Sequence, residues 1–313
     1  MDDLKTKRVV VTGGRGFLGK HLARILNSRG WMNVLPIDKS DYDLTEPEST
    51  KALIKDLTPA VIIHLAAVVG GIGANRKHPG LFFYENAVMG IHLMEEARKG
   101  GVEKFVQIGT VCAYPKFTPV PFAEKYLWSG YPEETNAPYG LAKKMLLVQA
   151  QAYRAEYGFN AIYLVPVNLY GPGDNFDPES SHVIPALIRK FTEAVREKRT
   201  TVEIWGTGMA SREFLYVEDA AEAIAMATEL YDGPEPVNIG AGFEITIADL
   251  AKIIAEKCGY VGETLFDPAY PDGQPRRCLD VSRAEKLFGF KARTLFGIGL
   301  DRTVKWFREN HRK

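Results

Sequence analysis

A glycine-rich turn near the start of the chain is the feature that most constrains the fold. The run Val9-Val10-Val11 before the turn has the character of a buried strand, and HLARILNSRG after it has helical spacing. Between them, residues 12–19 read TGGRGFLG, with glycines in a G-x-x-G-x-x-G pattern. Glycine permits a tight turn, close approach of the backbone to a phosphate, and close packing of helix on strand. This order predicts that the chain opens with the first strand and helix of a dinucleotide-binding fold.

Strand-like and helix-like segments continue to alternate through the first half of the chain. Apolar, strand-like runs follow at residues 34–38, 60–65, 104–108 and 161–165. Stretches with helical spacing lie at residues 48–57, 81–100 and 136–156. Such alternation is typical of a parallel sheet with right-handed crossovers and helices on both faces. We therefore expect an α/β protein with a Rossmann-type, doubly wound parallel sheet.

The regular alternation ends after about Gly171, so we expect the later segments to build a smaller C-terminal α/β lobe over the carboxyl ends of the strands. Residues 218–230 again have helical spacing, and we expect this helix to return to the first lobe. The predicted division is a dinucleotide-binding domain at 1–170, with a return segment at about 210–242, and a second, ligand-binding lobe at 171–209 and 243–313.

Composition excludes several other classes of protein. Lys plus Arg and Asp plus Glu both number 39, so the chain lacks the basic excess of a nucleic-acid-binding protein. Three cysteines are too few for a disulfide framework, and their spacing does not suggest a metal site, so we predict none. The first residues do not resemble a signal peptide, and no apolar run approaches the roughly 20 residues that span a bilayer. We expect a cytoplasmic protein with no nucleic-acid or membrane partner.

The identity of the dinucleotide stays open at this point. Asp38 ends the second strand-like run, where a carboxylate accepts hydrogen bonds from the adenosine ribose and favours NAD. Arg15 in the glycine turn and Lys39 beside the carboxylate are suited instead to the 2′-phosphate of NADP. Either cation is also compatible with an ordinary solvated surface charge.

A Tyr-x-x-x-Lys pair and a hydroxyl at a strand end predict reductase chemistry. Tyr139 and Lys143 are four residues apart and so lie on one face of a helix. A nearby ammonium would stabilise the phenolate and lower the tyrosine pKa from its usual value of about 10. Thr110 follows the strand-like run 104–108 and is placed to hold a substrate oxygen, and Cys112 would project to the same side if the chain stays extended.

The chain resembles the extended short-chain dehydrogenase/reductase superfamily over nearly its whole length, and most closely the GDP-L-fucose synthase family. The resemblance is carried by six stretches, namely VVGGIGAN (68–75), CAYPK (112–116), NLYGPGDNF (168–176), SHVIPALIRK (181–190), WGTG with REFLYVED (205–219), and PDGQPRR (271–277). It implies 3,5-epimerisation and then NADPH-dependent 4-reduction of GDP-4-keto-6-deoxy-D-mannose to GDP-L-fucose. It also implies a homodimer that pairs the Tyr139–Lys143 helix and its neighbour across a four-helix interface.

The resemblance also implies roles for the site residues. Cys112 and His182 match the family's base and acid for epimerisation, while Tyr139, Lys143 and Thr110 serve reduction. A thiolate at Cys112 needs a positive charge nearby, for which we expect protonated His182 or Lys143. The implied cofactor-binding residues are Gly13, Gly14, Arg15, Gly16, Phe17, Leu18, Gly19, Asp38, Lys39, Leu65, Ala66, Ala67, Lys143, Pro166, Asn168, Leu169 and His182. The implied substrate-binding residues are Lys190, Trp205, Arg212, Asp272 and Arg277.

Three residues depart from the family pattern. Thr110 stands where serine is usual and keeps the hydroxyl, whereas Lys190 stands where we expect arginine and offers a point charge in place of a two-pronged contact. Asp38 leaves open an alternative function, an NAD-dependent epimerase or 4-dehydrogenase acting on a related GDP-sugar such as a heptose. A redox-sensing binding protein is a further alternative, although such proteins usually lose the Tyr or Lys that this chain keeps. A 4,6-dehydratase would carry an acidic pair directly after the catalytic threonine, which is absent here.

Overall fold

The computed structural model describes residues 2–311, and its centre is a six-stranded sheet in which all neighbouring strands are parallel. The strand order is β10-β5-β4-β3-β1-β2. Because β2 lies on one side of β1 and the later strands extend on the other, the order reverses between β1 and β3, where α/β proteins bind ligands. The strands are β1 (Arg8–Thr12), β2 (Asn33–Ile37), β3 (Val61–His64), β4 (Lys104–Ile108), β5 (Ala161–Pro166) and β10 (Val237–Ile239).

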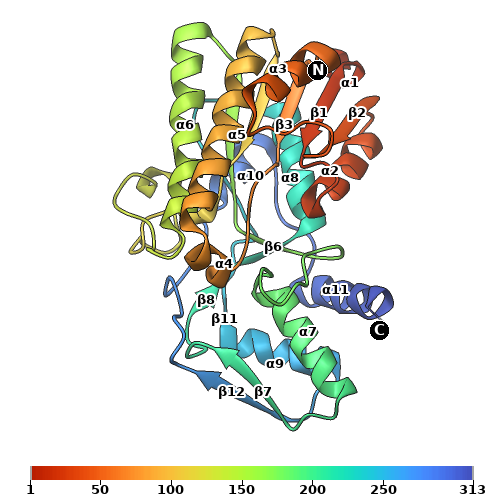
Figure 1. The fold of residues 1–313 in the computed structure, drawn as a ribbon, viewed down its shortest axis with the longest axis vertical. Coiled ribbons are helices and arrows are strands. Elements are labelled where there is room, and N and C mark those ends of the chain that lie inside the picture. Colours follow the sequence, from red (N-terminus) through yellow and green to blue (C-terminus); the bar gives the residue numbers. More distant parts are fainter. Residues whose placement is uncertain (1, 312–313) are drawn as a thin grey trace.

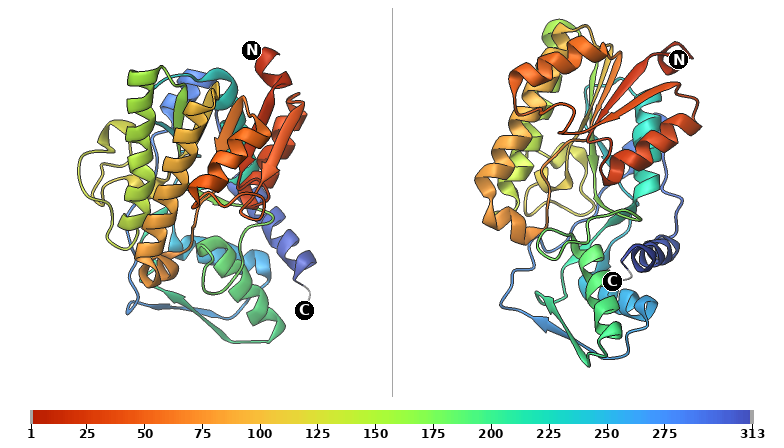
Figure 2. Two further views of the ribbon diagram at one scale, coloured as in Figure 1. Left: turned by 45° about the horizontal axis from the view of Figure 1, so that its top comes forward. Right: turned by 45° about the vertical axis from the view of Figure 1, so that its right-hand side comes forward.

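Helices cover both faces of this sheet, as Figures 1 and 2 show, and the expected doubly wound Rossmann-type fold is confirmed. The central strands are buried on both faces, which explains their continuous apolar sequence. One face carries α3 (Pro47–Leu57), α5 (Pro79–Lys99) and α6 (Ala137–Tyr157). The other carries α2 (Phe17–Ser28), α8 (Val217–Leu230) and α10 (Ser282–Phe288).

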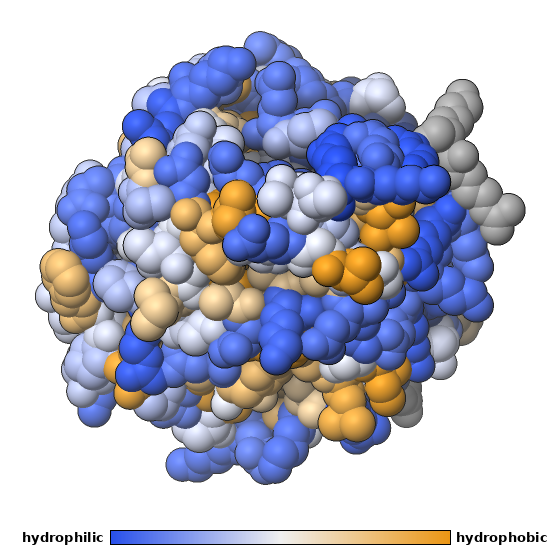
Figure 3. Space-filling view, turned by 90° about the horizontal axis from the view of Figure 1, so that it is seen from below, coloured by the Kyte–Doolittle hydropathy of each residue, from blue (hydrophilic) through white to orange (hydrophobic). Residues whose placement is uncertain are grey.

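The smaller lobe lies beyond the carboxyl ends of the strands, in the lower half of Figure 1, and has an apolar core of its own. Two of its strands, β7 (Thr201–Trp205) and β12 (Glu263–Asp267), pair in parallel beside α7 (Val183–Arg196), α9 (Ile247–Cys258) and α11 (Phe296–Asn310). Two further pairs lie between the lobes: β6 (Asn168–Tyr170) with β9 (Phe214–Tyr216), and β8 (Ser211–Arg212) with β11 (Ile245–Thr246). Figure 3 views the molecule from this end and shows a mainly hydrophilic surface with hydrophobic residues in small groups.

The remaining elements are short. They are α1 (Asp2–Thr6), α4 (Ile72–Lys77) and the 3-10 helices η1 (Val111–Ala113) and η2 (Glu124–Tyr126). Within residues 2–311, no helix has both the length and the apolar character needed to cross a bilayer.

The segment after residue 240 divides between the two lobes. Ala284 and Phe288 of α10 pack in the same apolar cluster as the central sheet, together with Leu279 and Phe290. The α9 and α11 helices instead contribute to the core of the smaller lobe. We therefore propose the lobe division given above with one change, which assigns the region of α10 to the first lobe.

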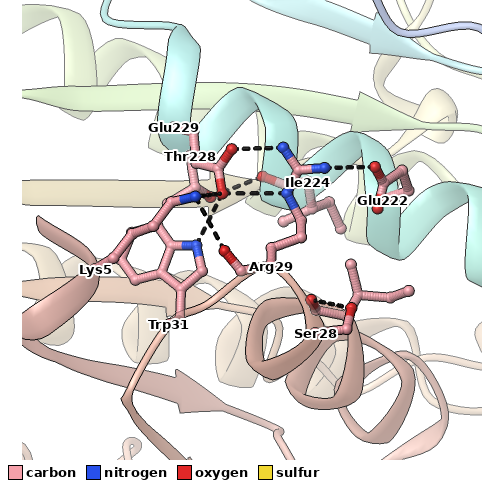
Figure 4. Close-up of polar contacts among 9 residues, drawn as sticks. Lys5, Ser28, Arg29, Trp31, Glu222, Ile224, Thr228 and Glu229 are labelled. Atoms are coloured by element: carbon pink, nitrogen blue, oxygen red, sulfur yellow. Dashed lines mark hydrogen bonds and ion pairs between the residues drawn. The ribbon is translucent and has the colours of Figure 1, made fainter. Parts of the chain in front are cut away.

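A network of charged side chains fastens α8 to the end of α2 (Figure 4). The Glu229 carboxylate accepts from Arg29, with Nη2 to Oε2 at 2.5 Å and Nε to Oε1 at 3.1 Å. The Trp31 indole donates to the same carboxylate at 3.0 Å, and the Lys5 ammonium lies 3.2 Å away. On the outer side, Arg29 also pairs with Glu222 at 2.6 Å. The network holds the return helix against the first βα unit of the sheet.

Candidate active site

A deep cleft of about 1060 Å³ opens at the carboxyl ends of β1, β3, β4 and β5 and is lined by residues of both lobes. Every site residue predicted from the sequence lines this cleft except Gly14 and Arg15. The cleft therefore coincides with the switch point in strand order, where a dinucleotide-binding fold holds its ligand.

The glycine turn has the backbone geometry that a dinucleotide site needs. Gly13 has φ +65°, and a Cβ atom there would lie 2.9 Å from the Ala66 amide nitrogen, so only glycine fits. Gly14 faces away from the cleft, since a Cβ atom there would lie 2.6 Å from Pro36 Cα of β2. Gly16 caps α2 without a side-chain bond, which leaves the first amides of that helix free to bind phosphate. These features fit a dinucleotide, with Gly14 allowing the turn to pack closely against β2.

The end of the cleft beside β2 is marked by charge pairing around Asp38. Ser40 donates to the Asp38 carboxylate from its amide at 2.9 Å and its hydroxyl at 2.7 Å, and Arg15 lies 3.2 Å from it. The Ser40 bonds first, and the Arg15 charge after them, hold the pKa of Asp38 below its usual range. Arg15 also pairs with Asp41 at 2.8 Å and lies outside the cleft lining, whereas the exposed Lys39 is part of it.

The floor of the cleft is built from chain that leaves β3 and β5. It includes the predicted residues Leu65, Ala66, Ala67, Pro166, Asn168 and Leu169. The Asn168 amide donates to the Glu213 carbonyl oxygen at 3.0 Å, which ties the floor to the crossing between the lobes. Of these side chains, only Asn168 offers a polar group to a ligand, and the others provide an apolar wall.

Tyr139 and Lys143 lie one turn apart on α6, and both line the cleft. Lys143 is only 2% exposed, and its ammonium has no hydrogen-bond or ion-pair partner among residues 2–311, so burial lowers its pKa to about 8. The pKa of Tyr139 is raised rather than lowered, by burial first and by the nearby Cys112 second, while a hydrogen bond with Thr110 opposes the rise. The phenol is therefore protonated near neutral pH, the state that a proton donor in reduction requires.

Thr110 and Cys112 reach the cleft by a different path from the one expected. The chain does not stay extended after β4, because residues 111–113 turn into the 3-10 helix η1. The Thr110 hydroxyl oxygen accepts from the Cys112 amide at 3.2 Å and so caps this turn. Both side chains line the cleft beside the phenol of Tyr139.

The cation in contact with the thiol is Arg277, in place of the expected His182 or Lys143. Its Nη1 lies 3.6 Å from the Cys112 sulfur, in hydrogen-bonding geometry. His182 immediately precedes α7, on the lobe opposite Tyr139, and lines the same cleft. Partial loss of hydration at the cleft wall, and after it the charge of Arg277, lower the pKa of His182.

The predicted substrate residues line the outer end of the cleft. The Lys190 ammonium donates to the Glu203 carbonyl at 2.9 Å and lies 6.0 Å from the centre of the Trp205 ring. Arg212 is buried, which lowers its pKa to about 9, and it donates to the Asp272 carbonyl at 2.7 Å. This end thus combines cations with a flat aromatic surface.

Asp272 makes bonds within the protein. Its carboxylate accepts from the Thr207 amide at 2.8 Å and the Thr207 hydroxyl at 2.7 Å. It therefore fixes the turn after β7, and with it the position of Trp205.

Three residues of the site were not identified from the sequence. Tyr270 stacks flat on Trp205, with ring centres 4.2 Å apart and planes at 2°. Gln274 is buried and joins Arg277 to the chain after η1. Asp174 has one carboxylate oxygen that is buried without a partner among the described residues, and burial raises its pKa to about 7. A carboxylate in the turn-rich loop after the 161–165 strand was the available signal for Asp174, whereas the other two depend on tertiary contacts.

Comparison with known proteins adds the family context. Residues 9–240 match the NAD dependent epimerase/dehydratase family. A probable GDP-L-fucose synthase of rice, Oryza sativa subsp. japonica, is 41% identical over 307 residues, covering 98% of this chain and 93% of its own. Among solved structures, a GDP-6-OMe-4-keto-L-xylo-heptose reductase from C. jejuni has a TM-score of 0.91 at 26% identity, covering 98% and 99% of the two chains. A GDP-L-fucose synthetase from Naegleria fowleri bound to NADP has a TM-score of 0.87 at 27% identity, covering 98% and 95%.

Proposed function

The chain belongs to the NAD dependent epimerase/dehydratase family and, within the extended short-chain dehydrogenases/reductases, to the GDP-L-fucose synthases, and on that premise we propose that it converts GDP-4-keto-6-deoxy-D-mannose to GDP-L-fucose. The conversion consists of inversion at carbons 3 and 5 followed by reduction at carbon 4. The observation that carries the proposal is one cleft that holds two sets of groups. Thr110, Tyr139 and Lys143 suit the reduction, and Cys112 and His182 suit the inversions.

The inversions need one group that removes a proton and one that returns it. The ketone at carbon 4 acidifies the hydrogens on both neighbouring carbons. The Cys112 thiolate takes such a proton, forming an S–H bond, while the electron pair of the broken C–H bond moves onto the ketone oxygen. His182, on the opposite lobe, acts as the imidazolium: it gives a proton to the other face of the carbon and becomes neutral, and the ketone re-forms. Before the second inversion, Cys112 loses its proton to water and His182 takes one up. Tyr139 and Thr110 stabilise the oxygen while it carries the negative charge.

The reduction uses the same ketone after inversion. A bound nicotinamide cofactor supplies the hydride for carbon 4. Tyr139 gives the phenol proton to the oxygen that becomes a hydroxyl, and its raised pKa keeps that proton in place until then. The buried Lys143 ammonium lies one helical turn from Tyr139 and, with no partner among residues 2–311, has its donors available for a cofactor hydroxyl.

We propose NADPH as the physiological form of the cofactor. Arg15 is the cation that would exchange its pairing with Asp38 and Asp41 for a 2′-phosphate, and both pairs lie at the surface where such an exchange costs little. An Arg15→Ala variant should raise the KM for NADPH by about tenfold and leave the KM for NADH nearly unchanged, since a hydrogen bond to a charged group contributes about 1.5–3 kcal/mol. If the KM for both cofactors rises equally, or NADH is the better substrate of the unaltered protein, the choice of NADPH is wrong.

The function is tested by deuterium incorporation. The protein is incubated with GDP-4-keto-6-deoxy-D-mannose in heavy water, first without and then with NADPH, and both stages are followed by NMR. We expect deuterium at carbons 3 and 5 before NADPH is added and GDP-L-fucose only afterwards. A 4-keto heptose linked to GDP is run in parallel, because a solved reductase of such a sugar is similar to this chain. Turnover of the heptose alone would assign that alternative instead.

A further inference from the structure

Arg277 has a position in the structure that binding of the substrate diphosphate does not explain. It is 6% exposed, and its Nη1 lies 3.6 Å from the Cys112 sulfur. A guanidinium that only gripped a ligand would direct its donors into the open cleft, whereas this one directs a donor at the protein's own thiol. Hydrogen bonding from a cation favours the thiolate over the thiol.

The direction of Arg277 is fixed by a buried glutamine. The Gln274 side-chain oxygen accepts from Arg277 Nε at 3.1 Å. The amide nitrogen of the same side chain donates to the carbonyl oxygens of Pro115 and Lys116, both at 3.0 Å. Gln274 is 2% exposed, so these bonds are shielded from water. The segment that carries Arg277 is thus tied to the segment that carries Cys112 by two separate sets of contacts.

Other charged and titratable groups also act on this pair. Arg212 interacts electrostatically with both Arg277 and Cys112, and Tyr139 with Cys112. Arg277 also lowers the pKa of His182. Arg277 hydrogen-bonds the sulfur, whereas Arg212 donates to the Ser211 and Asp272 carbonyl oxygens, both at 2.7 Å.

We propose that Arg277, oriented by Gln274, is a positioning residue that holds Cys112 as the thiolate from which epimerisation begins. The thiolate–guanidinium pair exists before substrate arrives. When Cys112 takes the substrate proton, the negative charge passes to the ketone oxygen, and Arg277 stays charged throughout. The role of the thiolate as a base rests on the proposed function, whereas the pair itself does not.

The pair is tested by alkylation of Cys112 with iodoacetamide, followed by mass spectrometry of the full-length protein. Cys258 and Cys278 are 1% and 7% exposed, so in the folded protein they report loss of structure. At pH 7, Arg277→Gln should slow alkylation of Cys112 about tenfold, because the thiolate fraction falls. Arg277→Lys should restore most of the rate. At pH 10 the alkylation rates of Cys112 in these variants and in the unaltered protein should converge, which a merely structural defect would not produce.

The matched control is Arg276→Gln. Arg276 is the preceding residue in the chain, but it is exposed, pairs with Glu244 and lies outside the cleft lining, so alkylation should stay at the rate of the unaltered protein. If Arg277→Gln alkylates as fast as the unaltered protein at pH 7 while its affinity for GDP falls tenfold, Arg277 is a diphosphate ligand and the proposal is overturned.

Two further measurements guard against misfolding and separate the two proposals. The first is the thiolate absorbance near 240 nm, taken as the difference between the unaltered protein and Cys112→Ser. It needs no arginine variant. Absence of a thiolate signal at pH 7 would also overturn the proposal. The second is Gln274→Met, which keeps the charge of Arg277 but removes the bond that orients its guanidinium. We expect alkylation of Cys112 to slow by about threefold. A thiolate that depends on Arg277, combined with no deuterium entry into the keto-sugar, would support the pair and reject the proposed function.

Discussion

At the scale of single residues, the buried ammonium of Lys143 predicts a pH limit for the reduction. Its pKa is lowered to about 8, so the charged form prevails below that pH and is lost as the pH rises through it. The single-turnover rate of NADPH oxidation should therefore fall above about pH 8. Lys143→Arg keeps its charge and should remove this fall, while Lys143→Met should be at least about tenfold slower at every pH. A rate of the unaltered protein that stays constant to pH 10 would contradict the assignment.

The buried carboxylate of Asp174, which lines the cleft, is predicted to lower the stability of the fold. Burial raises its folded pKa to about 7, so the carboxyl costs increasing stability as pH rises from its unfolded pKa of about 3.9 to the folded value. Asp174→Asn should therefore raise the free energy of unfolding, and by about 1 kcal/mol more at pH 8 than at pH 6. Urea unfolding at the two pH values measures this difference. Asp177→Asn in the same loop is the control and should lower the free energy of unfolding. Hydrogen bonds from Glu179 and Ser180 favour the Asp177 carboxylate and lower its pKa. Equal effects of Asp174→Asn at both pH values would count against this account.

Local spacing and long-range contact account for what could and could not be predicted at the site. The glycine turn and the Tyr139–Lys143 pair follow from spacing within one turn or helix, so the sequence was sufficient for both. The sequence left open whether the chain stays extended as far as Cys112, because the Thr110 cap that turns it into η1 is a side-chain effect that strand periodicity does not register. The contact of Cys112 with Arg277 joins residues 165 positions apart, and no local pattern specifies it.

At the scale of secondary-structure elements, the junction of α2 with α8 predicts a large and specific loss of stability. The Glu229 side chain is 8% exposed, accepts hydrogen bonds from Arg29 and Trp31, and forms an ion pair with Lys5. Glu229→Ala leaves the buried Trp31 indole without its acceptor and removes two bonds from Arg29, and it should lower the free energy of unfolding by about 2 kcal/mol. Glu222→Ala breaks an outer, more exposed pair and should cost less than about 1 kcal/mol. Urea unfolding of both variants makes the comparison, and similar losses would mean that burial is not the deciding factor.

The same junction has a defined pH dependence. Hydrogen bonds from Arg29 and Trp31, set against burial, leave the pKa of Glu229 below its usual value. Its contribution is therefore present above the unfolded pKa of about 4.3 and is lost as the pH falls through the lower folded value. The difference in free energy of unfolding between Glu229→Ala and the unaltered protein should therefore become smaller in acid.

At the scale of the whole molecule, the sequence was informative about the sheet and less so about the smaller lobe. The sheet is built from consecutive βα units, whose connections have a fixed hand, so its architecture follows once the alternation is recognised. The smaller lobe is assembled from three separated stretches of chain, and its core joins α7, α9 and α11, which only tertiary packing specifies. The helical pattern at 218–230 did predict α8, since its apolar face recurs at helical spacing and α8 packs on α2.

The outer faces of α5 and α6 lead to the last prediction, which concerns assembly. The two helices lie side by side on the outside of the sheet (Figure 1) and expose six large hydrophobic side chains. These are Leu81, Phe83 and Tyr84 on α5 and Met145, Val148 and Tyr157 on α6. We propose that two copies pair these faces as a four-helix interface, which would cover an apolar surface that a monomer would leave in water.

Val148→Glu tests the pairing, since a two-fold interface would bring its charges together in an apolar setting. Light scattering on a sizing column should give twice the chain mass for the unaltered protein and about the chain mass for the variant. Val261→Glu is the matched control, because Val261 is 99% exposed on the smaller lobe, remote from this face. Because the cleft lies within one chain, the monomeric variant should keep Cys112 alkylation unchanged. A monomeric unaltered protein, or a dimer that Val148→Glu does not disturb, would remove α5 and α6 as the interface.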